Sequence, residues 1–379
     1  MKKLLYGSTA LIAAGMVASS AVAAERVKIG ITGYFQAFAI FVDEDDGIGE
    51  PGANRREHSL EREGEIIFNG KTTLDNGIEV GVQVQLEAET CGDQIDESFI
   101  WFEGGFGRIN IGSENSAPYL MHYASPTASG SFAFGLNEMN FRGYQPGTHV
   151  SGPGGTTFTN PVLLSSDSEK FTYFTPRIAG FQLGVSYTPD NCEENGGPSA
   201  PGAVACGGTY GGTELDNNNT GEVFELSVNF VQKLGDFNVA VSASWGAADD
   251  EVGTAATDDP ELWSIGAQIG WGGFTFGGAY TDAENIAGTR GFDTEDYNLG
   301  VRYATGPWGV GIQYAHKETS VAGAADDEID AFEIGGSYDL GPGVSLHAGV
   351  QFWNLDDGAS AAAAENDATI LFVGTSISF

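Results

Sequence analysis

Apolar and polar residues alternate one by one through most of the chain. The stretch 78–86 reads IEVGVQVQL and the stretch 237–245 reads FNVAVSASW, so apolar side chains return at every second position. A repeat of two sends alternate side chains to opposite faces of a β-strand. We therefore predict strands with one apolar face and one polar or small-residue face, at 27–41, 57–69, 77–89, 97–104, 107–113, 169–177, 180–188, 222–233, 237–246, 260–271, 274–283, 294–304, 308–317, 329–339, 344–354 and 367–379.

The connections between these segments are of two kinds. Tight turns rich in glycine or asparagine, such as 74–77 and 340–343, alternate with longer acidic connections, such as 43–56 and 247–260. Glycine and asparagine supply the positive φ angles that tight hairpins need. Strict alternation places every tight turn at one end of the sheet and every long loop at the other. All backbone hydrogen bonds close only if the last strand pairs with the first.

This pattern distinguishes a membrane barrel from a soluble β-sandwich, whose apolar faces pack between two sheets. Strands of about ten residues, tilted by about 45°, cross the roughly 25 Å apolar band of an outer membrane. Aromatic residues mark both ends of the apolar faces, as in Phe237 and Trp245 or Trp308 and Tyr314. Such amphipathic rings suit the lipid headgroup regions. The fold class we predict is all-β, a sixteen-stranded antiparallel transmembrane β-barrel, and a soluble all-β protein is the alternative.

Composition and charge exclude several other classes. The chain has 379 residues, 56 of them glycine, with 16 basic against 52 acidic residues and a formal net charge of −36. Glycine at this frequency argues against an all-helical fold. An aromatic content of 11% argues against disorder. No nucleic-acid partner is expected, because the chain cannot assemble a basic patch for phosphates.

The N-terminus has the features of an export signal. Two lysines follow the first methionine and precede an apolar, small-residue stretch, and AVA at 21–23 offers a small-x-small cleavage site. We predict a signal peptide at 1–23 and one barrel domain at 24–379, with cleavage after Ala24 equally open. The alternative is a membrane-anchoring helix, for which the glycines and serines make the stretch weakly apolar.

Two segments resemble a known family. DESFIWFEGGFGRINIGSENSAPY at 96–119 is similar to the strand–turn–strand that leads into the constriction loop of Gram-negative porins, and EKFTYFTPRIAGFQLGVSY at 169–187 resembles the hairpin after that loop. The chain also ends on Phe379, like the terminal aromatic residue by which outer-membrane barrels are recognised for assembly. The resemblance is closest to general porins of alphaproteobacteria. It implies a homotrimeric outer-membrane channel for passive diffusion of ions and small hydrophilic solutes, with the long third loop folded into the lumen.

Residues 114–168 form by far the longest connection, and a structureless stretch of this length is usually functional. In the porin family, acidic residues of this loop face a basic cluster on the barrel wall. The corresponding loop candidates here are the carboxylates Glu114 and Glu138, together with Arg142. By strand parity, the basic residues on the lumen face are Lys28, Arg108, Lys170 and Arg302. The basic cluster of the family is therefore only partly matched.

Carboxylates outnumber basic residues on the predicted lumen face. They are Glu61, Glu63, Glu65, Glu79, Glu87, Glu333 and Asp339. Charges that line a pore attract ions of opposite sign and repel those of like sign. We therefore expect a weak preference for cations, while the alternative for any single glutamate is a solvated lumen residue without special effect. The facing of Arg62 stays open.

Acidic clusters in predicted external loops suggest a metal site. Asp43, Asp45 and Asp46 offer hard oxygen ligands that suit Ca²⁺ or Mg²⁺. Such an ion would bridge the loop to lipopolysaccharide phosphates in the outer membrane. The alternative is a solvated acidic loop.

The three cysteines allow one disulfide. Cys192 and Cys206 fall in one predicted loop and could pair in the oxidising periplasm. Cys91 would then be the odd residue. Three cysteines allow three pairings, so the other two stay open.

Catalysis and substrate-specific transport are the remaining alternatives. A barrel hydrolase would need a clustered Ser-His-Asp set, and the sequence carries neither a nucleophile-elbow pattern nor a zinc-binding histidine pair. We therefore predict no enzyme. A substrate-specific channel, for example for sugars, would need an aromatic track along the lumen. The inward aromatic residues are too scattered in the sequence to indicate one; they are Tyr34, Phe38, Phe174, Trp353 and Phe372.

Overall fold

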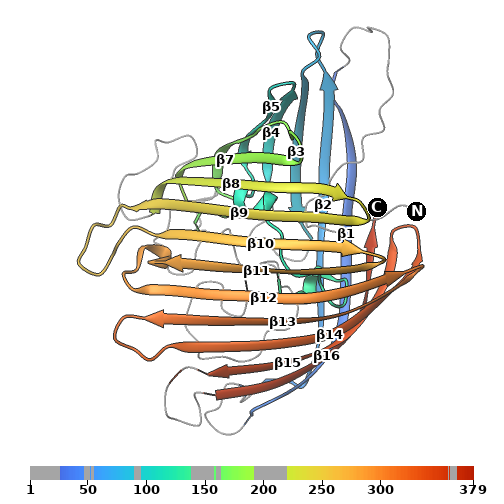
Figure 1. Cartoon of the computed structure of the whole chain (residues 1–379), viewed down its shortest axis with the longest axis vertical. Coiled ribbons are helices and arrows are strands. Elements are labelled where there is room, and N and C mark those ends of the chain that lie inside the picture. The colour runs from blue at the N-terminus through green and yellow to red at the C-terminus, as the bar shows by residue number, and fades with distance from the viewer. Residues whose placement is uncertain are drawn as a thin grey trace.

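The computed structural model describes residues 26–46, 52, 55–88, 95–137, 158, 164–191, 220–356, 358 and 365–379. Its antiparallel strands form one closed barrel (Figure 1). The strands are β1 Lys28–Glu44, β2 His58–Thr73, β3 Glu79–Glu87, β4 Ser98–Gly104, β5 Gly107–Ser113, β6 Glu169–Phe174, β7 Phe181–Asp190, β8 Thr220–Leu234, β9 Phe237–Asp250, β10 Glu261–Trp271, β11 Phe274–Glu284, β12 Phe292–Thr305, β13 Trp308–Val321, β14 Asp327–Gly341, β15 Val344–Asp356 and β16 Glu365–Ser378. The predicted fold class and number of strands are confirmed.

The two ends of the chain close the barrel, as the sequence predicted. β1 pairs with β16 in antiparallel register, and every other strand pairs with its neighbours in the sequence. Gly33 and Phe379 exchange two backbone hydrogen bonds of 2.9 Å at this seam. Several strands extend beyond their predicted ends, since β2 continues to Thr73 and β8 begins at Thr220. Backbone pairing thus continues where the apolar alternation has already ended.

Alternate side chains along each strand face outward and inward. Phe41 and Leu371, which pair across β1 and β16, are 54% and 53% exposed on the outer surface. Their inward neighbours Ile40 and Ile370 are fully buried. Exposed large apolar side chains lie on the outer face of every strand except β3, and such a surface suits contact with lipid.

Part of the long connection between β5 and β6 lies inside the barrel. We call residues 114–168 the inner loop, whose described parts are 114–137, 158 and 164–168. It contains the short helix α1, Ala117–Met121, and the 3₁₀ turn η1, Phe132–Phe134. In Figure 1 the teal segment that carries α1 lies within the ring of strands, and α1 contacts β6 to β9. A second 3₁₀ turn, η2, Ile286–Gly288, precedes β12. Within the described ranges, no helix is both long enough and apolar enough to span a membrane.

Candidate functional site

The inner loop follows the inner wall from β7 round to β15. Its backbone groups pair in turn with inward side chains, each from a different strand. These bonds join Ala117 N to Ser186 Oγ (2.9 Å), Met121 O to Asn229 Nδ2 (3.1 Å), Tyr123 N to Ser242 Oγ (2.9 Å), Ala124 O to Gln268 Nε2 (2.7 Å), Ser125 N to Asn298 Oδ1 (2.8 Å), Ala128 N to Gln313 Oε1 (2.9 Å), Ser129 N to Glu333 Oε1 (2.9 Å) and Phe134 O to Gln351 Nε2 (2.7 Å). Buried backbone groups need such partners in place of water. The wall side chains therefore hold the loop flat against this side of the barrel.

Glycines on the wall allow this close approach. A Cβ atom at Gly266 would lie 1.7 Å from the carbonyl oxygen of Tyr123, and one at Gly335 would lie 2.7 Å from Cα of Ser129. Gly335 itself pairs across the sheet with Gly311 on β13. Any side chain at these positions would push the loop backbone off the wall and towards the lumen.

An apolar cluster anchors the far part of the loop. Phe134, Leu136 and Phe158 of the loop are buried against inward residues of β1 and β13 to β16. The ring of Phe134 stacks on Phe372 with centroids 3.9 Å apart and planes 9° apart. The wall side of the cluster consists of Phe38, Ile40, Val42, Ala315, Ile329, Ala331, Trp353, Leu355, Ala368, Ile370 and Phe372.

Three of the five inward aromatic residues, which are far apart in the sequence, come together in space. Phe38, Trp353 and Phe372 all lie in the apolar cluster, because barrel closure brings β1 next to β16 and β15. These three rings are 4% exposed or less, since the inner loop covers them. They therefore form a binding surface for the loop and not an aromatic track along the lumen.

Carboxylates gather on the inner wall of β2 and β3. Oxygens of Glu63, Glu65 and Glu87 lie within 4.8 Å of one another. The Tyr34 hydroxyl on β1 lies 3.0 Å from Glu63 Oε1 and 2.8 Å from Glu65 Oε1. Glu61, the inward neighbour of Glu63 along β2, is partly exposed. These hard oxygen ligands suit a divalent cation, and they give this sector of the wall a strong negative potential.

Two of the predicted lumen residues, Lys28 and Glu79, lie at the tight-turn end of this sector. Lys28 begins β1 opposite Lys71. Lys71 forms an ion pair of 2.9 Å with Glu79. The negative charge of Glu79 is therefore balanced locally by Lys71.

Arg108 lies on β5 next to the base of the inner loop. Its Nε donates to Asn110 Oδ1 at 2.7 Å, and its guanidinium carbon lies 4.7 Å from the centre of the Trp101 ring. Asn110 in turn donates to the carboxylate of Glu114. Arg108 is thus connected to the first residue of the loop through one side chain.

Arg302 and Lys170 contact the inner loop directly. Arg302 on β12 donates to the carbonyl oxygen of Ala128 at 2.7 Å and to Ser337 Oγ at 2.6 Å. Lys170 on β6 is 4% exposed, and its ammonium donates to three loop carbonyls. Parity correctly places both residues on the inner face, but it does not indicate that the loop covers them.

Glu114 begins the inner loop in a buried position. Burial raises the pKa of its carboxyl group to about 7, although the Asn110 hydrogen bond and the charges of Arg108 and Lys170 act in the opposite direction. Burial also raises the pKa of Glu97, and the negative charges of Asp167 and Glu114 add to this effect. Sequence reasoning did not single out Glu97 or Asp167 as part of this site, because strand parity does not show which residues outside the strands meet at the loop base.

Several predicted sites lie outside the described residues. They are Glu138 and Arg142 of the inner loop, the cysteines Cys91, Cys192 and Cys206, and the signal peptide at 1–23. The loop charges, the disulfide and the cleavage site therefore stay predictions.

The proposed cation ligands Asp43 and Asp45 lie at the long-loop end of β1. The Asp45 backbone N–H donates to Asn366 Oδ1 at 3.1 Å, and Asp45 Oδ2 accepts from the backbone N–H of Asp367 at 3.2 Å. Asp43, Asp45 and Asp367 help to line a hollow of about 360 Å³. Asp46 follows Asp45 and is exposed. A Ca²⁺ or Mg²⁺ site here stays a prediction.

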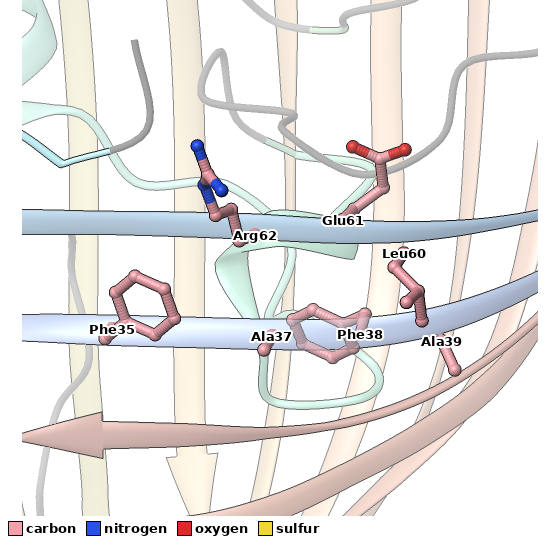
Figure 2. A pocket seen from close by; sticks show the side chains of 7 residues that line it. All are labelled: Phe35, Ala37, Phe38, Ala39, Leu60, Glu61 and Arg62. Carbon is pink, nitrogen blue, oxygen red and sulfur yellow. The ribbon is translucent and has the colours of Figure 1, made fainter.

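The facing of Arg62 is outward. Leu60 and Ile66, which share its parity on β2, are 84% and 40% exposed, and Arg62 pairs with Ala37 near the middle of β1. Figure 2 shows Arg62 beside Ala37 and Leu60 beside Ala39, in a hollow of about 620 Å³. Outward charge at this height is unusual on a barrel that faces lipid on all sides.

A closed barrel with an apolar outer surface, a polar inner wall and a loop held inside is the architecture of a transmembrane channel. The model of the Gram-negative porin family matches residues 7–358. The chain belongs to this family. It is therefore an outer-membrane channel for small solutes and not an enzyme.

Comparison with individual protein sequences also finds similarity to a porin. The chain is 21% identical over 299 residues to a porin of Rhodobacter capsulatus, covering 75% of this chain and 85% of that protein. It is also 21% identical over 327 residues to an uncharacterized protein of Rickettsia felis, covering 72% and 73% of the two chains.

Solved structures share the fold. The anion-selective porin of Comamonas acidovorans superposes with a TM-score of 0.65 at 18% identity, over 93% of this chain and 100% of that chain. OmpT of Vibrio cholerae, in its trimer form, gives a TM-score of 0.61 at 12% identity, over 94% and 100%. At these identities the likeness concerns the barrel alone.

Proposed function

We propose that the protein is a general diffusion channel with a weak preference for cations. The observation that supports this preference is the acidic sector of β2 and β3, with Glu63, Glu65 and Glu87 close together and Glu61 beside them. Negative charges along a pore raise the local concentration of cations and lower that of anions. Arg302 and Lys170 direct hydrogen bonds to loop carbonyls, and Lys170 is buried beneath the loop.

The lumen supports general diffusion better than recognition of one substrate. Stacking on sugars or other rings would need exposed inward aromatics, but Phe38, Trp353 and Phe372 are buried in the apolar cluster. Liposome swelling with a size series of neutral sugars and amino acids tests this proposal. We expect uptake rates that depend on solute size alone, and a single sugar that enters much faster than others of its size would favour the substrate-specific alternative.

Charge preference is tested by the reversal potential of the purified protein in a planar bilayer under a KCl gradient. We expect a potential that favours K⁺, and a shift towards zero in the double variant Glu65→Gln/Glu87→Gln, because two wall charges are lost. Lys71→Met/Glu79→Gln is the control, since it removes both partners of an ion pair and leaves the net charge of the wall unchanged. A wild-type potential that favours Cl⁻ would contradict the proposal.

We further propose that three copies assemble through the outer face of β1 to β6. Arg62 faces outward near the middle of this wall, and an arginine against lipid at that depth costs roughly 2–4 kcal/mol. β4, β5 and β6 have 7, 7 and 6 residues, so at 45° tilt they rise only about 14–16 Å of the roughly 25 Å apolar band. Neighbouring copies in place of lipid would remove the cost of the arginine and would cover the part of the apolar band that the short strands do not span. The trimer form of OmpT of Vibrio cholerae is consistent with such an assembly.

Lipid accessibility tests this face. In a chain whose native cysteines are replaced by serine, Ala37→Cys lies beside Arg62 and Ile265→Cys lies on the outer face of β10. We expect a membrane-soluble maleimide to label Ile265→Cys fast and Ala37→Cys slowly in native membranes. Equal labelling, or a detergent-solubilised mass of one chain, would contradict a trimer that uses this face.

A further inference from the structure

The base of the inner loop is closed by two buried wall residues of opposite charge. The loop leaves the wall after β5 and returns before β6, and these two strands pair with each other through Ser113 and Glu169. Lys170 on β6 and Glu225 on β8 are 4% and 1% exposed. Each of them bonds to both the beginning and the end of the loop.

Lys170 holds backbone carbonyls from both ends. Its Nζ donates to the carbonyl oxygen of Glu114 at the beginning of the loop, and to those of Ser166 (2.7 Å) and Ser168 (2.6 Å) at its end. An ammonium group has three N–H donors. All three are therefore used by the loop base.

Glu225 makes the complementary connection through hydroxyl groups. Its Oε1 accepts from Ser116 Oγ at 2.9 Å and its Oε2 accepts from Ser165 Oγ at 2.5 Å. Ser116 lies at the beginning of the loop and Ser165 at its end. A hydrogen bond to a charged group is about twice as strong as one between neutral groups. Each of these contacts therefore holds the loop more firmly than an ordinary polar contact.

The charged groups around Lys170 lie at the loop base and not along the open passage. Glu97, Glu114 and Asp167 act electrostatically on Lys170 together with Glu225. One buried cation thus lies among four carboxyl groups, and its hydrogen bonds are directed to the loop. A residue in this position controls where the loop lies much more than which ions are attracted.

We propose that Lys170 and Glu225 are positioning residues that fix the inner loop at its base and thereby set the width of the pore. The inference rests on the channel function and goes beyond strand parity, which places Lys170 among the lumen charges. A lumen charge and a positioning residue make different predictions: removing the first shifts ion selectivity, whereas removing the second disturbs conductance.

The test compares single-channel recordings of Lys170→Met, Lys170→Arg and wild type in planar bilayers. We expect Lys170→Met to lose the single conductance level and to show several sub-levels, at an unchanged reversal potential. Lys170→Arg should restore the single level, because a guanidinium group keeps several donors. Lys317→Met is the matched control, since Lys317 is equally buried on β13 and lies away from the loop base; it should keep the wild-type level.

Two results would overturn the proposal. One is a Lys170→Met channel with wild-type conductance, and the other is a shift in reversal potential without sub-levels. If Lys170→Met does not assemble, Ser116→Ala/Ser165→Ala removes both hydroxyl contacts of Glu225 with little change in volume. Sub-levels in this variant would support the proposal and wild-type recordings would overturn it. Absence of channels in the wild type would count against the channel function itself and not against this role of Lys170.

Discussion

Inward charged residues belong to two groups that differ in what surrounds them. Glu65 and Glu87 are partly exposed on β2 and β3, whereas Lys170, Glu225 and Glu333 are buried under the inner loop. Strand parity predicts the inward face of Glu65, Glu87, Lys170 and Glu333, because side chains alternate along a strand; Glu225 was not singled out from the sequence. Parity cannot predict which of them the loop covers, since that depends on a segment far away in the sequence.

The pH dependence of the stability of Glu114→Gln tests whether the base of the inner loop is buried. The carboxyl pKa of Glu114 is about 7 in the folded protein against an ordinary value of 4.5, so the folded state keeps a proton that the unfolded state loses. Stability from this group is present below pH 4.5 and is lost as the pH rises to about 7. The loss amounts to roughly 3 kcal/mol.

Glutamine resembles the neutral carboxyl group and does not titrate. Unfolding of vesicle-inserted protein by urea, followed by tryptophan fluorescence, should therefore show Glu114→Gln gaining stability relative to wild type between pH 4.5 and pH 8. A stability difference that stays constant over this range would contradict the burial of Glu114.

At the scale of elements, strands and turns follow from local sequence, whereas the path of the inner loop does not. Alternation and glycine turns are properties of neighbouring residues, so the strands were predicted close to their observed bounds. The loop path depends on one polar side chain from each of several strands, and Ser186 or Asn298 looks like any other inward polar residue. Inward glycines recur on the successive strands β10 to β14 and were a readable signal of this path; they are Gly266, Gly277, Gly300, Gly311 and Gly335.

Gly266→Ala tests whether the loop lies directly on the wall. The new methyl group would meet the carbonyl oxygen of Tyr123 at 1.7 Å, so the loop must move towards the lumen. We expect lower single-channel conductance and a destabilisation of about 1–3 kcal/mol, as for other overpacked sites. Gly105→Ala is the control, because its Cβ would meet nothing within 4 Å. Unchanged conductance in Gly266→Ala would show that the loop does not rest there.

At the scale of the whole molecule, closure of the barrel determines how the backbone groups are satisfied and which distant residues meet inside. Pairing of β1 with β16 leaves no free strand edge, so every backbone group of the wall can be satisfied in lipid. Closure also brings Phe38 and Phe372 together under the inner loop. The sequence predicted closure because an unpaired edge strand would leave backbone groups unsatisfied in lipid. It did not predict the apolar cluster, whose wall residues lie near opposite ends of the chain.

The conductance of the purified wild-type protein in a planar bilayer with equal salt on both sides tests the channel most directly. A water-filled passage between the acidic sector and the inner loop predicts discrete current steps of uniform size that rise linearly with voltage and grow with the conductivity of the salt solution. A bilayer that stays silent after insertion of folded barrels would contradict an open passage.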